Sequence, residues 1–197
     1  MATKTLNELF RDVIIKNELG GNLHAVLRFS DPDGVQSGKS GWSFGVCQFD
    51  TRNNPAALEC LKACGFTPAE IAGIVNQTID VKPLATKLQA AADTVARYDE
   101  AQLSDCLDRA LSIATEHGVP LSDSAAILAL ADYDNQYYFS DIDKPGTLLA
   151  FIANLGRPVT ADDVLDFKLT HTKYGETHPA DCRRRYDNLM QVVRQEA

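Results

Sequence analysis

Apolar positions near the start of the chain recur every three or four residues, the period of an α-helix with one buried face. The pattern covers residues 5–17 and consists of Leu6, Leu9, Phe10, Val13 and Ile14. Gly20 and Gly21 follow, and glycine commonly ends a helix because it accepts a left-handed backbone. The sequence therefore predicts an amphipathic helix that ends close to Glu18.

Residues 25–50 have a different character. Strand-forming residues make up AVLRF (residues 25–29), turn residues fill SDPDG (residues 30–34), and glycine recurs at positions 34, 38, 41 and 45. Strand-forming residues followed by turn chemistry are typical of a hairpin. We therefore expect a small β-hairpin region with a long tip.

The remainder of the chain is predicted to be almost entirely helical. Capping signals are present at Asn54, which precedes a proline, at Thr67 with Glu70, and at Thr160. Further helices are predicted over residues 83–98, 100–117, 122–133, 146–156, 160–171 and 180–195. Because no linker or repeat interrupts this order, we expect one mainly α domain, residues 1–197, with a small β-hairpin region.

Charge and composition disfavour several classes of protein. The 197 residues carry a formal net charge of −8 and a pI near 4.9, which disfavours a nucleic-acid binder that neutralises phosphates. The N-terminus lacks the apolar core of a signal peptide, and no stretch approaches the roughly 20 apolar residues of a membrane helix. The five cysteines are an odd number, so we expect reduced, buried thiols in a protein made in the cytoplasm without a signal peptide.

The segment DPDGVQSGKSGWSFGVCQFD contains two near matches to catalytic motifs. A phosphate-binding P-loop is strongly disfavoured because Gly34 stands one residue too late and Asp33 would repel phosphate. GWSFG matches the nucleophile elbow of serine hydrolases, with Ser43 as nucleophile and His171 or His178 as base. That elbow needs a helix after it and a parallel sheet. The sequence offers too few strands, so nucleophilic Ser43 is kept as an alternative only.

A third interpretation combines Glu18 with the same segment. NELGG (residues 17–21), FGVCQ (residues 44–48) and ALADYDNQYY (residues 129–138) resemble three parts of the lysozyme-like superfamily. These parts are the helix end that carries the acid, the GLMQ segment of soluble lytic transglycosylases and goose-type lysozymes, and the helix that ends in a tyrosine–asparagine element. The resemblance spans most of the chain and implies a lysozyme-like fold.

The same resemblance implies an activity. It predicts cleavage of the β-1,4 bond between N-acetylmuramic acid and N-acetylglucosamine in the glycan strand of peptidoglycan, with no metal or cofactor. The branch of the superfamily stays open: Gln48 follows Glu18 at a longer distance than in the transglycosylases, and Leu27 stands where phage-type lysozymes have an aspartate. Hydrolase and lytic transglycosylase are both retained.

Glu18 is assigned as the general acid by this resemblance. Cleavage of a glycosidic bond needs a protonated carboxyl beside the leaving oxygen. The apolar neighbours Ile14, Ile15 and Leu19 and the C-terminal end of a helix both favour the protonated form. A solvated glutamate in the last helical turn is the alternative.

A second carboxylate would position water or stabilise the transition state. Asp31, Asp33 and Asp50 are the candidates, and Asp50 is preferred because it follows a strand. Each also has a structural interpretation, since SDPDG is turn chemistry in its own right and Asp50 can cap the following TRNN. Asp33 is kept as a substrate-binding residue.

Further residues are expected to contact the sugar. Gly45 would let the backbone approach it closely, Gln48 would bind an acetamido group or orient Glu18, and Ser43 would be a polar cleft residue. Flat faces for stacking are offered by Trp42, Tyr133, Tyr137 and Tyr138, with Asn135 as the amide of the tyrosine–asparagine element. Aromatic residues at such positions belong equally often to the core.

The expected partner is peptidoglycan, reached without a signal peptide. A phage endolysin released through a holin and an effector exported to the periplasm by a dedicated secretion machine both suit the sequence, the effector with an immunity or delivery protein. A chitinase or chitosanase is the nearest enzymatic alternative. The alternative from another class is a non-catalytic lysozyme-fold protein that binds glycan or a protein.

Overall fold

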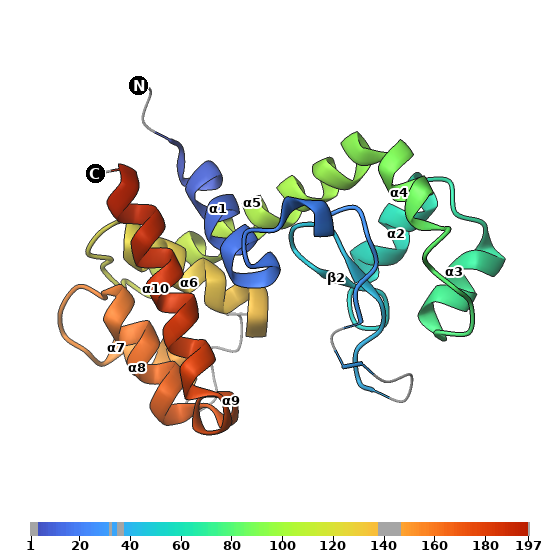
Figure 1. The fold of residues 1–197 in the computed structure, drawn as a ribbon. Helices are drawn as coiled ribbons and strands as arrows, with labels where there is room; N and C mark the ends of the chain where they lie inside the picture. Colours follow the sequence, from blue (N-terminus) through green and yellow to red (C-terminus); the bar gives the residue numbers. More distant parts are fainter. Residues whose placement is uncertain (1–3, 32, 35–37, 138–146, 197) are drawn as a thin grey trace. The chain divides into compact units, whose positions relative to one another are not determined.

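The computed structural model describes residues 4–31, 33–34, 38–137 and 147–196 (Figure 1). This part of the chain is mainly helical with one small antiparallel sheet, which confirms the predicted α class with a β-hairpin. The chain forms two compact units. We call Met1–Asn17 with Leu103–Ala197 the helical unit, and Glu18–Gln102 the hairpin unit. The expectation that residues 1–197 form one catalytic domain stays a prediction.

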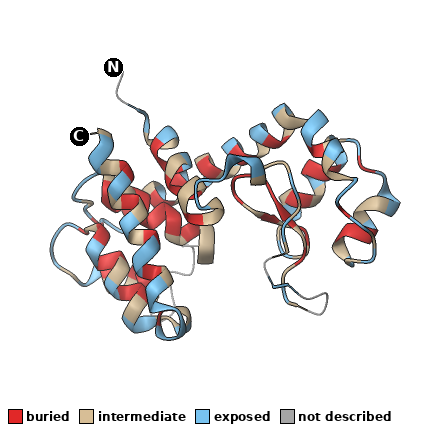
Figure 2. Cartoon of the chain, in the orientation of Figure 1, coloured by how far each residue is buried: buried red, intermediate tan, exposed pale blue. Residues whose placement is uncertain are grey.

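The helical unit is built around α6. Its helices are α1 (Leu6–Leu19, up to Asn17), the C-terminal part of α5 (Ala92–Glu116), α6 (Ser124–Tyr137), α7 (Leu148–Ala153), α8 (Ala161–His171), α9 (Lys173–Thr177) and α10 (Pro179–Glu196). The sequence predicts α6 as the most apolar helix, and most of its length is buried (Figure 2). α8 and α10 both pack against it. Its many alanines allow this close approach because they present small side chains.

The hairpin unit surrounds a cluster of phenylalanines. Its elements are the 3₁₀ helix η1 (Leu23–Ala25), β1 (Ser43–Phe44), β2 (Phe49–Asp50), α2 (Pro55–Ala63), α3 (Pro68–Val75), α4 (Ala85–Ala90) and the N-terminal part of α5. In the antiparallel hairpin, Ser43 pairs with Asp50 and Phe44 with Phe49. Both phenylalanines are fully buried, and Phe29 meets Phe44 edge-on at 5.7 Å between ring centroids.

Local capping chemistry sets several helix boundaries as predicted. The Asn54 side chain accepts a hydrogen bond from the N–H of Ala56 and caps α2. Capping boxes open α3 at Thr67 and α8 at Thr160. Each cap satisfies N–H groups that have no partner within the first helical turn.

The predicted strand at AVLRF is wrong. The Asn22 side chain accepts from the N–H of His24 and starts η1. Turn bonds between residues three apart continue to Arg28, and the first residue in a β-bridge to the hairpin is Ser30, which pairs with Ser43. Before it, the carbonyl of Val26 accepts one hydrogen bond from the N–H of Gly45 in the hairpin turn. Local turn bonds and this single contact therefore take the place of a continuous strand ladder.

The predicted break between residues 98 and 100 is also wrong. α5 runs without interruption from Ala92 to Glu116, and the chain breaks earlier, at Ala91. Asp99 is only 2 % exposed, and its Oδ1 accepts a hydrogen bond from the N–H of Cys47 at 2.9 Å. Because this carboxylate is used in a tertiary contact, it does not cap a new helix.

We expect Gly175→Ala to destabilise the protein more than Gly65→Ala. A Cβ at Gly175 would overlap the carbonyl oxygen of Lys168 where α9 follows α8, a backbone clash that we expect to cost about 3 kcal/mol. Gly65 has a left-handed φ of +81° and nothing near its missing Cβ, so alanine there costs only about 1–2 kcal/mol. Urea unfolding measures both losses, and equal losses would contradict this packing of α9.

Candidate functional site

Glu18 lies in the last turn of α1. It is half-buried, and the helix ends at the next residue, Leu19. Gly20 and Gly21 then adopt left-handed φ angles of +57° and +81°, which turn the chain away. The predicted position of this glutamate at a helix end is confirmed, and its role as an acid stays a prediction.

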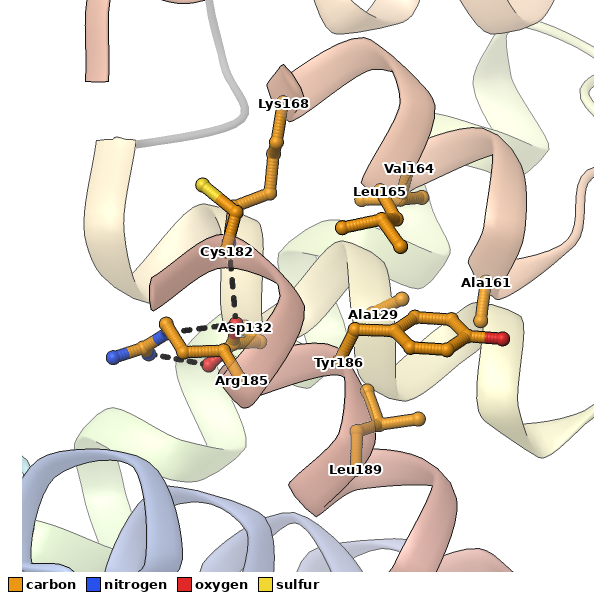
Figure 3. Close-up of a pocket in the computed structure, with 10 residues that line it drawn as sticks. All are labelled: Ala129, Asp132, Ala161, Val164, Leu165, Lys168, Cys182, Arg185, Tyr186 and Leu189. Atoms are coloured by element: carbon orange, nitrogen blue, oxygen red, sulfur yellow. Dashed lines mark hydrogen bonds and ion pairs between the residues drawn. The ribbon is translucent and has the colours of Figure 1, made fainter. Parts of the chain in front are cut away.

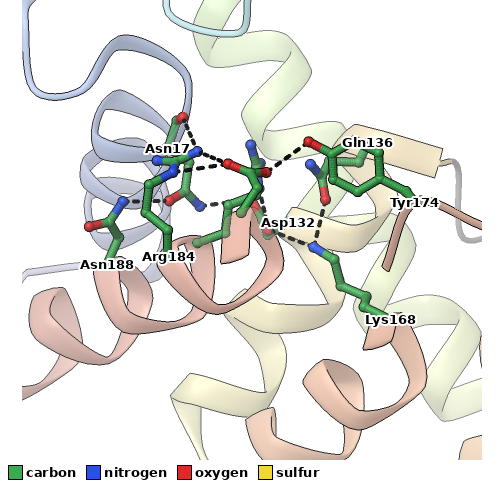
Figure 4. A network of polar contacts seen from close by, with 9 residues as sticks. Asn17, Asp132, Gln136, Lys168, Tyr174, Arg184 and Asn188 are labelled. Carbon is green, nitrogen blue, oxygen red and sulfur yellow. Dashed lines mark hydrogen bonds and ion pairs between the residues drawn. The ribbon is translucent and has the colours of Figure 1, made fainter. Parts of the chain in front are cut away.

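The residue before Glu18 is fixed by three hydrogen bonds (Figure 4). The Nδ2 of Asn17 donates to Asp132 on α6 at 3.1 Å. Its Oδ1 accepts from Asn188 at 3.0 Å, and its carbonyl accepts from Arg184 at 3.2 Å, both on α10. Asn17 is 5 % exposed. The last turn of α1 is therefore held in place by side chains from two other helices.

Asp132 is the centre of this network, and buried cations surround it. Its Oδ1 accepts from Arg185 Nη2 at 2.6 Å, and its Oδ2 lies 3.6 Å from Lys168 Nζ. Burial alone raises the pKa of Asp132, but the charges of Arg185 and Lys168 outweigh this effect and hold the pKa below its usual value. Lys168 also donates to Gln136 at 2.6 Å, and its burial lowers its own pKa.

A small cavity of about 20 Å³ lies beside this network (Figure 3). Its walls are Ala129, Asp132, Ala161, Val164, Leu165, Lys168, Cys182, Arg185, Tyr186 and Leu189. This volume holds about one water molecule, and a sugar ring does not fit. We therefore interpret the ion network as structural support for α1 and not as a substrate site.

Ser43 is unsuited to the serine-hydrolase elbow. It is 3 % exposed on β1, and its backbone N–H and carbonyl both bond to Ser30 at 2.8 Å. The chain after β1 turns into antiparallel β2, whereas the elbow requires a following helix and a parallel sheet. The surroundings of Ser43 are therefore not those of a nucleophile elbow, and its predicted roles in catalysis and in contact with a sugar stay predictions.

The turn between β1 and β2 is packed against α5. Gly45 has a φ of +79°, and a Cβ there would lie 2.8 Å from Asp99 Oδ1 and 2.9 Å from the Phe49 ring. Packing against Asp99 and Phe49 is thus sufficient reason for glycine at this position, and close approach of a sugar to Gly45 stays a prediction. Gln48 donates to the carbonyl of Gly45 at 2.9 Å and accepts from the Ser30 hydroxyl at 2.7 Å. Gln48 therefore braces the hairpin, and its bond to an acetamido group stays a prediction.

Asp99, which anchors this turn, is not among the site residues predicted from the sequence. It occupies a position on the buried stripe of α5 between Val95 and Leu103, both fully buried. Because Asp99 is four residues from each of these apolar residues, it shares their helix face, and this spacing in the sequence indicates a buried aspartate. Buried carboxylates need hydrogen-bond partners, and the N–H of Cys47 is one of them.

Asp50 is held by backbone donors. Its Oδ1 accepts from the N–H groups of Gly41 at 2.9 Å and Arg52 at 2.8 Å, and its Oδ2 from the Asn53 side chain at 2.7 Å. Burial raises the pKa of Asp50, but these hydrogen bonds outweigh it, so the pKa is lowered. The alternative of a cap on the TRNN turn describes this geometry; the catalytic role of Asp50 stays a prediction.

Asp31 and Asp33 are turn residues. Asp31 accepts from the N–H of Gly34 at 3.0 Å and Asp33 from the N–H of Ser40 at 2.7 Å. In both cases the carboxylate satisfies a backbone donor of the loop that leads into β1. This is the turn chemistry that SDPDG indicates, and substrate binding by Asp33 stays a prediction.

The predicted stacking residues lie in different units. Trp42 precedes β1 in the hairpin unit and is half-buried. Tyr133, Asn135 and Tyr137 lie on α6 in the helical unit, where the two tyrosine rings are 5.0 Å apart and burial raises the pKa of both. Tyr138 lies outside the described residues. Stacking of these rings on a sugar stays a prediction.

Comparisons with protein-family models, with curated proteins and with solved structures find no match to this chain. Among the described residues, no helix is both long and apolar enough to cross a bilayer. The same residues contain no cluster of three histidine, cysteine or acidic side chains suited to a metal ion. The candidate site stays the one predicted from the sequence, with Glu18 at the end of α1 and with Ser43 and Gln48 in the hairpin.

Asp132→Asn should destabilise the protein strongly. It leaves Arg185 and Lys168 buried without a counter-charge, so we expect the free energy of unfolding at pH 7 to fall by about 3–5 kcal/mol. Asp187 is an exposed aspartate on α10, and Asp187→Asn is the matched control. If urea unfolding gives the two variants equal stability, the network does not support the fold.

The same pair of variants gives a pH test. Because folding lowers the pKa of Asp132, its stabilisation is complete above the unfolded pKa of 3.8 and is lost as the pH falls through the lower folded value. The wild type and Asp187→Asn should therefore lose more stability than Asp132→Asn as the pH falls below 3.8. Parallel pH profiles for all three proteins would contradict the lowered pKa.

Proposed function

We propose that the protein is a glycosidase that cleaves the β-1,4 bond between N-acetylmuramic acid and N-acetylglucosamine in peptidoglycan, with Glu18 as general acid. One structural observation carries the proposal. Glu18 is a half-buried carboxyl in the last turn of α1, directly after Asn17, whose three hydrogen bonds fix that turn. The resemblance of NELGG and FGVCQ to the lysozyme-like superfamily supports the same role.

General acid catalysis depends on position before it depends on acidity. The donor has to lie within hydrogen-bond reach of the leaving oxygen, about 2.6–3.2 Å. Residues on rigid helices, supported by further hydrogen bonds, hold such a geometry better than residues on loops. The bonds from α6 and α10 to Asn17 give the backbone next to Glu18 this support.

The second half of the reaction distinguishes two mechanisms. A hydrolase needs another carboxylate to activate water or to stabilise the sugar cation. Asp31, Asp33 and Asp50 each accept backbone N–H groups in turns. We therefore favour the transglycosylase route, in which the sugar's own 6-hydroxyl attacks the anomeric carbon and gives its proton to the carboxylate of Glu18.

Glu18→Gln should abolish most of the release of glycan fragments from purified peptidoglycan. Glutamine keeps the shape of the side chain but has no proton to donate, so the rate should fall about 100-fold or more. The matched control is Glu59→Gln, on the surface of α2 in the same unit. Both variants should unfold at the urea concentration of the wild type.

Mass spectrometry of the fragments separates the alternatives. Anhydro-muramyl ends identify a lytic transglycosylase, and reducing muramyl ends identify a hydrolase. Cleavage of chitin or chitosan oligomers with peptidoglycan left intact would place the protein with chitinases or chitosanases. If the wild type binds glycan but releases no fragments, the protein is a non-catalytic binder. Full activity of Glu18→Gln would refute the assignment of Glu18 as the general acid.

A further inference from the structure

The hairpin unit contains a groove that none of the candidate site residues lines. It has a volume of about 450 Å³ and lies between the segment before the hairpin and α4 with the residues that lead into it. Its walls are Arg28, Phe29, Val81, Lys82, Ala85 and Gln89. Pockets that bind small ligands commonly measure about 300–1,000 Å³ and combine an apolar floor with a few polar groups.

The apolar floor of the groove is fixed by aromatic packing. The Phe29 ring meets Phe44 at 5.7 Å and Phe66 at 6.1 Å, in both cases edge to face. Val81 is 6 % exposed. A ligand that enters the groove therefore meets a surface that is already held in shape.

Two cations line the groove, and within the part of the chain that the structure describes the Asp80 carboxylate beside them accepts only the backbone N–H of Lys82, at 3.0 Å. Among the described residues, the side chains of Arg28 and Lys82 make no hydrogen bond or ion pair, and both are exposed. By contrast, Lys62 pairs with Glu59 and Lys87 with Glu70, each at 2.7 Å.

The whole chain has a net charge of −8, so these two cations give the groove a positive charge opposite in sign to that of the chain. Two cations beside one concave surface attract an anionic ligand and can bind its carboxylates directly. The Gln89 side chain at the same groove offers an amide donor and an amide acceptor. This combination suits a peptide that carries carboxylates.

The groove is joined to the candidate site by the chain itself. Phe29 is followed by Ser30, whose backbone pairs with Ser43 and whose hydroxyl donates to Gln48. Phe29 in the groove is therefore the neighbour in sequence of a residue that bonds directly to the hairpin.

We propose that the groove binds the carboxylate-bearing stem peptide that is attached to N-acetylmuramic acid. Arg28 and Lys82 pair with the peptide's carboxylates, Gln89 bonds to a peptide amide, and Phe29 with Val81 contacts its alkyl groups. The identity of this ligand rests on the proposed function, since a peptidoglycan strand presents glycan and stem together. The groove would thus select strands whose stems keep their free carboxylates.

The test measures binding to the full chain carrying Glu18→Gln, so that cleavage does not interfere. Three probes are titrated by calorimetry: the muramyl disaccharide with its tripeptide stem, the same molecule with the stem carboxylates amidated, and the disaccharide without a stem. Arg28→Gln with Lys82→Gln is compared with the matched pair Lys62→Gln with Arg97→Gln, two exposed cations of the same unit away from the groove.

We expect the acidic stem to bind more tightly than the amidated stem. The double variant at the groove should weaken binding of the acidic stem about tenfold, because two partly exposed charge pairs are lost. It should leave the affinity for the bare disaccharide unchanged, and the control pair should change neither affinity. Added salt should weaken binding of the acidic stem only.

Two results would overturn the proposal: equal affinity for acidic and amidated stems, or an unchanged affinity in the groove variant. Competition by inorganic phosphate at the same concentration as the stem would show a general anion site and would also overturn it. Failure of the proposed function is detected by a separate measurement. In that case the wild-type protein releases no glycan fragments from peptidoglycan, whether or not the groove binds the stem peptide.

Discussion

The buried charge of Asp132 determines how the helical unit is assembled. A carboxylate that is 5 % exposed is tolerated only with compensating charge and hydrogen bonds, and these come from Arg185, Lys168 and Asn17. They lie on α10, α8 and α1, so one side chain on α6 fixes the register of three other helices. The last turn of α1, and with it the backbone at Glu18, depends on this arrangement.

The hairpin unit repeats the same principle on a smaller scale. Its strands contain two residues each, too few to be stable through their own pairing. The Asp99 carboxylate on α5 bonds to the turn at Cys47, and Ser30 bonds to Ser43 and Gln48. The hairpin is therefore positioned by polar contacts from outside the sheet, and the residues proposed to meet glycan are held by the same contacts.

The sequence predicts what local chemistry determines. The caps at Thr67 and Thr160 and the glycine stop after Glu18 are predictable because each signal lies within a few residues of the feature it specifies. The contacts of Asp99 and Asp132 are not predictable, because their partners are distant in the chain and become neighbours only after folding. The candidate site divides in the same way: the helix end at Glu18 was predictable, whereas the groove at Arg28 was not.

The most direct test of the account is a crystal structure of Glu18→Gln with a peptidoglycan tetrasaccharide bound. We predict that the amide of residue 18 lies within about 3.2 Å of the oxygen of one glycosidic bond, with the sugar chain running past the hairpin. A tetrasaccharide bound with every glycosidic oxygen far from residue 18 would contradict the assignment of Glu18 as the acid. The proposed glycosidase activity with Glu18 as general acid would then be wrong.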